Sequence, residues 1–111
     1  KNFVVWGSGN QMRDFIHIKD VIRGSLLITN KIKNGKAVNL SSGKFISFID
    51  LSKKILRILG KKNIKVIGNS TKPEGVFARG GSRLLQKKYG FVPKVSVDQG
   101  IKWAIKYFQR Y

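Results

Sequence analysis

The feature of this sequence that most constrains its fold is a pair of capping boxes. In such a box, a serine at a helix start is followed three residues later by a side chain that can return the hydrogen bond. Residues 47–50 (Ser-Phe-Ile-Asp) and 96–99 (Ser-Val-Asp-Gln) have this pattern. Apolar residues at helical spacing follow each box, so we predict one helix that ends at Gly60 and another that runs to about Phe108.

The rest of the chain alternates between runs of β-branched or aromatic residues and helical patterns. The predicted strands are residues 3–6, 12–18, 37–40 and 64–67, and the further predicted helices are residues 20–33 and 82–89. Residues 68–81 contain four glycines and one proline and are predicted to be a long loop, of the kind that often carries function. This order predicts a single mixed α/β domain over residues 1–111, with short strands and about four helices.

Hydrophobic residues make up 41% of the chain, which is enough for a folded domain with one modest core. The first predicted helix contributes one broad apolar face. Its residues are Val21, Ile22, Leu26, Ile28 and Ile32.

The charge is strongly positive, with 23 Lys and Arg against 5 Asp and Glu, a net charge of +18. Such a surplus attracts anions, including nucleic acids, acidic lipid headgroups and phosphorylated small molecules. The basic residues are spread over every predicted element, which is typical of a solvated surface. A small basic nucleic-acid-binding module is an alternative function, although no helix-turn-helix or aromatic sheet motif indicates specific nucleic-acid binding.

Several classes of site are excluded by composition. The lack of cysteine excludes disulfides, thiolate metal sites and a cysteine nucleophile, and is compatible with a reducing cytoplasm, where we place the protein. No apolar run approaches the ~20 residues of a membrane span, so no membrane partner is expected. The five acids are too scattered for a metal site. Asp14 and Glu74 remain for a site, since the other three acids lie at helix starts, and a structural role is favoured for the single histidine, His17.

Residues 7–9 (Gly-Ser-Gly) resemble the beginning of a dinucleotide-binding fingerprint. The third position of that fingerprint is occupied by Met12, and a strand is predicted to follow where a helix is required, so we reject this interpretation. The Tyr-x-x-x-Lys pair, a proton donor for hydride chemistry, is also absent. We therefore predict no catalytic residue in this chain and no NAD(P) bound by this chain alone.

Four motifs in order resemble the extended short-chain dehydrogenase/reductase family of sugar-nucleotide enzymes, and most of all its GDP-sugar branch of reductases and epimerases. They are residues 4–21 (from Val-Val-Trp-Gly to Lys-Asp-Val), 38–43 (Val-Asn-Leu-Ser-Ser-Gly), 72–75 (Lys-Pro-Glu-Gly) and 89–93 (Tyr-Gly-Phe-Val-Pro). Together they cover nearly the whole chain.

This resemblance implies the C-terminal substrate-binding portion of a Rossmann-type enzyme. The N-terminal dinucleotide-binding part, which holds NAD(P), is expected upstream, as the start inside a strand without Met suggests, and the parent enzyme is expected to be a homodimer. The implied ligand is a nucleotide sugar, with a GDP-sugar favoured, and the reaction could be epimerisation, dehydration or reduction. The residues implied to bind the ligand are Trp6, Arg13, Lys72, Glu74 and Arg79.

Overall fold

The serines of both predicted capping boxes act as N-caps in the computed structural model, which describes residues 1–110. Ser47 Oγ accepts a hydrogen bond from the Asp50 N–H at 3.0 Å, and helix α2 (Phe48–Ile58) follows. Ser96 Oγ accepts from the Gln99 N–H at 3.2 Å, ahead of helix α4 (Val97–Phe108). The two helices predicted from these boxes are confirmed.

The other two predicted helices form with shifted ends. Helix α1 (Ile18–Thr29) begins earlier than predicted because His17 acts as its N-cap, with Nδ1 accepting from the Lys19 N–H at 3.2 Å. Helix α3 (Leu84–Lys88) is shorter than predicted and has no side-chain cap. The predicted structural role of His17 is thus confirmed.

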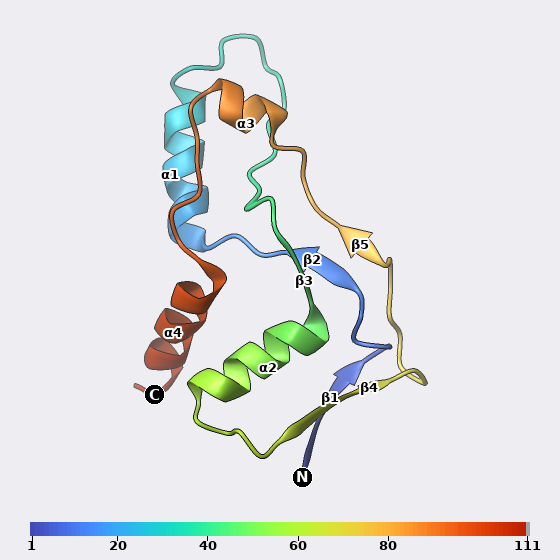
Figure 1. Ribbon diagram of the computed structural model, residues 1–111. Helices are drawn as coiled ribbons and strands as arrows, with labels where there is room; N and C mark the ends of the chain where they lie inside the picture. Colours follow the sequence, from blue (N-terminus) through green and yellow to red (C-terminus); the bar gives the residue numbers. More distant parts are fainter. Residues whose placement is uncertain (111) are drawn as a thin grey trace.

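Five short strands form two small sheets (Figure 1). Strand β1 (Asn2–Trp6) pairs in parallel with β4 (Lys65–Asn69). In the second sheet, β2 (Met12–Asp14) lies between antiparallel β3 (Phe45–Ser47) and parallel β5 (Ala78–Arg79). The strand predicted at residues 12–18 stops at Asp14, because the chain must leave the sheet to cap α1 at His17.

The prediction of a strand at residues 37–40 is wrong, since these residues form no regular structure. A strand is stable only when its backbone groups pair with a neighbouring strand, and no strand within residues 1–110 lies beside this segment. The Gln86 side chain instead pairs with the next residue: its Oε1 accepts from the Ser41 N–H at 2.8 Å, and its Nε2 donates to the Ser41 carbonyl at 2.9 Å.

The buried apolar core is smaller than the sequence suggests. Among the described residues, only Ile28, Leu56 and Phe91 are buried hydrophobic residues, while Ile22 and Leu26 of the predicted apolar face are 55% and 65% exposed. The chain is elongated, 53 × 33 × 20 Å, with a Cα radius of gyration of 16.5 Å. A compact domain of this length would have a radius of gyration of about 13 Å. The apolar face predicted for α1 is therefore only partly buried.

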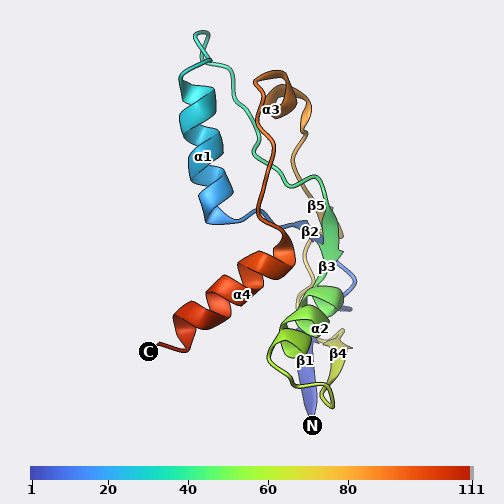
Figure 2. The ribbon, with the colours of Figure 1, turned by 60° about the vertical axis from the view of Figure 1, so that its left-hand side comes forward.

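The molecule has two regions, which Figure 2 shows one above the other. The upper lobe consists of α1, residues 30–44 and α3, and the lower body consists of both sheets with α2. Helix α4 extends from the junction between them.

Two buried or partly buried carboxylates join these regions. Asp20 in α1 is 1% exposed and accepts hydrogen bonds from the N–H groups of Lys94 and Val95, at 2.9 and 2.8 Å, just before α4. Asp14 at the end of β2 accepts from the hydroxyls of Ser41 and Ser42 and from the Ser42 N–H. Burial raises the pKa of each carboxyl, but the hydrogen bonds it accepts outweigh burial, so both pKa values lie below the ordinary range.

Candidate functional site

The glycine turn after β1, residues 7–9, allows neighbouring segments to pack closely against it. Gly7 and Gly9 have φ angles of +73° and +79°, which favour glycine. A Cβ on Gly7 would lie 2.7 Å from Glu74 Cβ, and one on Gly9 would overlap the Ile49 side chain. Strand β2 follows the turn, where a dinucleotide fingerprint requires a helix. The strand that was predicted to follow this turn is confirmed, and the turn does not lead into a helix as a dinucleotide fingerprint does.

Glu74 fastens the long loop to this turn. Its Oε2 accepts from the Ser8 N–H at 3.1 Å and its Oε1 accepts from the Ser8 hydroxyl at 2.5 Å. These hydrogen bonds hold the pKa of Glu74 below its ordinary value. In the structure, Glu74 positions residues 72–76 next to the end of β1, and both of its oxygens have partners.

Trp6 ends β1 and presents an open aromatic surface. Its side chain is 62% exposed, while its carbonyl accepts a hydrogen bond from Gln11 Nε2 at 2.8 Å. Lys72 Nζ lies 5.8 Å from the centre of the Trp6 ring, within the range of a cation–π contact. The ring can therefore stack against a planar ligand group next to a cation.

Arg13 and Arg79 are register partners on the parallel strands β2 and β5. The Arg13 guanidinium donates to the Val76 carbonyl at 3.0 Å and to the Met12 carbonyl at 2.7 Å, and its carbon lies 5.6 Å from the Phe48 ring centre. Neither arginine forms an ion pair within the described part of the chain. The charges of both arginines are therefore available to bind an anion.

The five residues predicted to bind a ligand thus belong to one neighbourhood: the end of β1, strand β2, and the chain from Lys72 to Arg79. Three cations and an exposed tryptophan can bind an anion that carries a planar ring. Sequence reasoning missed Ser8 and Phe48, which position the loop and Arg13. Ser8 could have been identified from its place between two turn glycines, whereas Phe48 looked like one more apolar helix residue.

Asp14 and Glu74, the two acids left over by sequence reasoning, both accept hydrogen bonds from serines. No group of three His, Cys, Asp or Glu within residues 1–110 could hold a metal ion. None of the helices in that range is long and apolar enough to cross a membrane.

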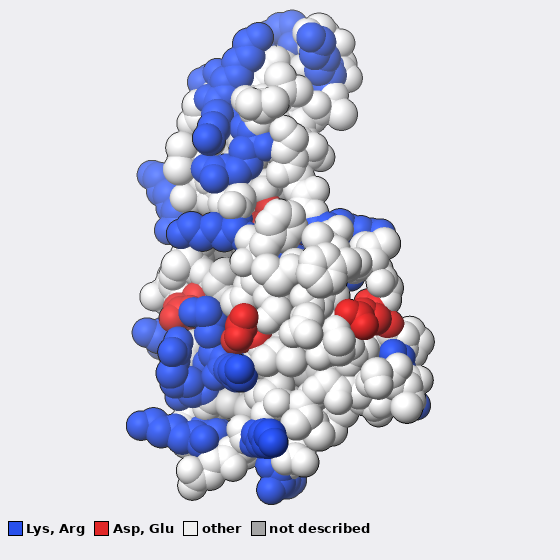
Figure 3. Space-filling view, turned by 45° about the vertical axis from the view of Figure 1, so that its right-hand side comes forward, with Lys and Arg blue, Asp and Glu red and all other residues white. Residues whose placement is uncertain are grey.

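Figure 3 shows how charge is distributed over one face of the molecule. Lys and Arg cover much of the upper lobe and gather again along the lower edge, while Asp and Glu appear only as small separate areas. The basic surface therefore extends over both regions, in agreement with the predicted scatter of basic residues.

Comparison with known proteins identifies relatives among sugar-nucleotide enzymes. Residues 1–41 match the NAD dependent epimerase/dehydratase family. A putative GDP-L-fucose synthase 2 from Arabidopsis thaliana is 26% identical over 105 residues, covering 95% of this chain and 32% of that protein. The GDP-mannose 3,5-epimerase of the same plant is 31% identical over 107 residues, covering 96% of this chain and 27% of that protein. The chain spans about a third of the length of these relatives.

Solved structures show the same fold. UDP-glucose 4-epimerase from Thermotoga maritima, determined with UDP-glucose, superposes with a TM-score of 0.85 at 24% identity, covering 99% of this chain and 35% of that one. dTDP-glucose 4,6-dehydratase from Bacillus anthracis, determined in complex with NAD, gives a TM-score of 0.82 at 18% identity, covering 99% and 35%. The predicted α/β class is confirmed, and the fold corresponds to about a third of such enzymes.

Proposed function

We propose that this chain, which belongs to the NAD-dependent epimerase/dehydratase family, forms the C-terminal, nucleotide-sugar-binding part of an NAD(P)-dependent epimerase, dehydratase or reductase. The observation that carries the proposal is that Arg13 and Arg79 lie opposite each other on the adjacent strands β2 and β5. Neither arginine forms an ion pair within residues 1–110. The exposed ring of Trp6 belongs to the same neighbourhood.

Each residue then has a role that follows from its chemistry. Arg13, already oriented by the Val76 carbonyl, binds diphosphate oxygens through its planar fork, and Arg79 and Lys72 add charge. Trp6 stacks on the nucleotide base or sugar. Glu74 keeps the loop in place through Ser8, so that the cations stay near the end of β1.

The hydride chemistry belongs to NAD(P) and to residues outside this chain. Strand β2 follows the glycine turn, so this turn lacks the helix of a dinucleotide-binding fingerprint. The dinucleotide-binding part has a surface to cover here, since Ile22 and Leu26 of α1 are exposed and residues 37–40 lack a paired strand. Among nucleotide sugars we favour a GDP-sugar, because the relatives include a putative GDP-L-fucose synthase and a GDP-mannose epimerase.

Replacement of Arg13 by alanine tests the proposal. Arg13→Ala should weaken GDP binding, measured by isothermal titration calorimetry, by about 1.5–3 kcal/mol, the usual range for a hydrogen bond to a charged group. The matched control is Lys36→Ala, which removes one exposed cation from the upper lobe. Unchanged affinity in Arg13→Ala, or equal losses in both variants, would refute the assignment of Arg13.

A second candidate, a basic nucleic-acid-binding module, is favoured only by the net charge of +18. Under our proposal, binding to random-sequence DNA is nonspecific. The logarithm of its binding constant falls with the logarithm of the salt concentration, with a slope of about 0.9 per phosphate neutralised. Fluorescence anisotropy between low and physiological salt measures this slope. Sequence-selective binding that survives physiological salt would favour the second candidate.

A further inference from the structure

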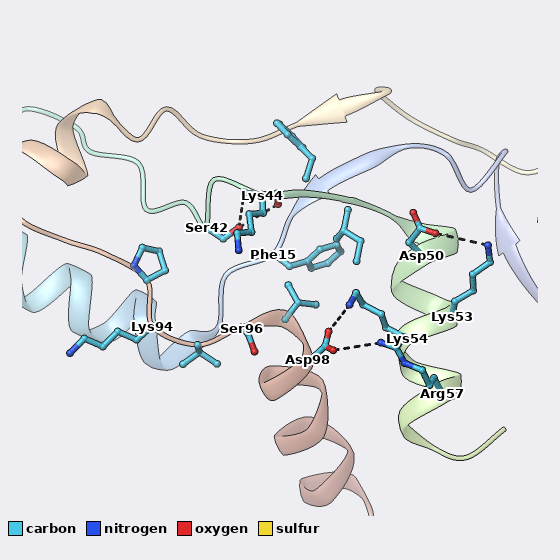
Figure 4. A pocket seen from close by; sticks show the side chains of 15 residues that line it. Phe15, Ser42, Lys44, Asp50, Lys53, Lys54, Arg57, Lys94, Ser96 and Asp98 are labelled. Atoms are coloured by element: carbon cyan, nitrogen blue, oxygen red, sulfur yellow. Dashed lines mark hydrogen bonds and ion pairs between the residues drawn. The ribbon is translucent and has the colours of Figure 1, made fainter. Parts of the chain in front are cut away.

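A cleft of about 840 Å³ lies between β3, helix α2 and the segment that leads into α4 (Figure 4). This volume is within the range of sites for small organic molecules. Residues from four separate parts of the sequence line the cleft, from Phe15 to Asp98. None of them is among the residues assigned to the nucleotide sugar.

The lining combines apolar and basic side chains. Phe15, Phe45, Ile46, Val95 and Val97 supply the apolar part. The basic lining residues are Lys44, Lys53, Lys54, Arg57 and Lys94, against two acids, Asp50 and Asp98. Five positive charges against two negative charges leave a net charge of +3, which favours an anionic ligand with an apolar portion.

Two of these cations are held in place by one acid. Lys54 Nζ lies 2.7 Å from Asp98 Oδ1, and an Arg57 guanidinium nitrogen lies 3.6 Å from Asp98 Oδ2. A single carboxylate therefore orients two cations and neutralises only one of their charges. Lys44, on the opposite wall in Figure 4, forms no ion pair with any described residue.

We propose that this cleft binds an organic phosphate, whose phosphate group lies between Lys44 and Lys54 and whose apolar part packs on Phe15 and Val95. Lys54 is held in place by Asp98 on one wall, and Lys44 on the facing wall is unpaired within the described residues. Two such lysines suit a phosphate that carries up to two negative charges. The apolar lining distinguishes such a ligand from inorganic phosphate, which would leave the hydrophobic part of the cleft wet. The lining of this cleft shares no residue with the proposed nucleotide-sugar site.

The test uses 2-naphthyl phosphate as the probe. Inorganic phosphate and 2-naphthol, which represent its charged and apolar halves, are measured as separate comparison ligands. Binding is followed by the backbone amide NMR shifts of residues 42–46 and 95–98. We expect the probe to bind more tightly than either half. Lys44→Ala should weaken probe binding by about tenfold to a hundredfold, as expected for loss of one hydrogen bond to a charged group.

Two matched variants make the outcome decisive. Lys36→Ala removes an equally unpaired lysine of the same loop segment, and Arg13→Ala removes a cation of the other site; both should leave probe affinity unchanged. Three results would overturn the proposal: equal weakening in Lys36→Ala and Lys44→Ala, inorganic phosphate binding as tightly as the probe, or dependence of probe binding on Arg13 instead of Lys44. Absence of probe binding at millimolar concentration would overturn it as well.

Discussion

The upper lobe and the lower body contain helices with similar local signals, yet they differ in what their apolar residues contact. In the body, β1 and β4 pair over five residues, and the buried Leu56 of α2 belongs to the core. In the lobe, α1 has a side-chain cap at His17 and buries Ile28, but Ile22 and Leu26 remain more than half exposed. Caps determine where a helix starts, whereas burial depends on elements elsewhere in the chain or in a partner.

Phe91 is the main apolar contact that the lobe does have. It is fully buried, its ring leaves no space for a Cβ at Gly24 of α1, and the Arg23 guanidinium lies 4.9 Å from the ring centre. The lobe therefore depends on two buried apolar side chains, Ile28 and Phe91, while the body also has paired strands.

The largest expected effect comes from removing this contact. Phe91→Ala should lower the free energy of unfolding by about 3–5 kcal/mol, because it leaves a cavity where an aromatic ring was buried. Hydrogen exchange should show α1 amides losing protection before those of β1 and β4. Urea unfolding measures the free-energy change. The control is Val92→Ala, because the neighbouring Val92 is 58% exposed. Equal loss of protection in both regions would show that the lobe and body unfold as one unit.

Acid should weaken the junction between the two regions. The pKa values of Asp14 and Asp20 are lowered in the folded state, so their contribution to stability is present above the ordinary carboxyl pKa, about 4. It is lost as the pH falls through the lower folded pKa. The urea midpoint should thus fall on acidification below pH of about 4, and less steeply in Asp20→Asn. An identical pH profile in this variant would contradict a role for Asp20.

The smallest expected effect on stability is in the body at Trp6. Since this side chain is 62% exposed, Trp6→Ala should change the free energy of unfolding by only about 0.5–1 kcal/mol. GDP affinity should fall more than this, because the ring would lose its stacking contact with the ligand. Calorimetric affinity and thermal melting of the same variant separate the two effects. A large drop in melting temperature with unchanged GDP affinity would make Trp6 a packing residue.

The difference between the two regions also shows what could be predicted from sequence. The starts of α2 and α4 were predictable, because a capping serine and its partner lie within four residues. Residues 37–40 have the composition of a strand, but strand formation depends on a neighbour that local sequence does not reveal.

The same reasoning applies to the candidate site. Arg13 and Glu74 could be chosen from their motifs, but the Ser8 contacts of Glu74 span 66 residues of sequence and were not predictable. Asp20 was predicted to lie at the start of a helix. It lies in the first turn of α1, but its hydrogen bonds to residues 94 and 95, more than seventy positions away, become visible only in the folded chain.

The way in which Asp20 holds the segment before α4 has a consequence for how this surface can diversify. Its carboxylate binds the main-chain N–H groups of Lys94 and Val95, so the attachment does not depend on which side chains these positions carry. Any residue except proline keeps the donor. Both positions also line the cleft beside α2. Related sequences can therefore alter the ligand preference of the cleft at these two positions while the junction stays intact.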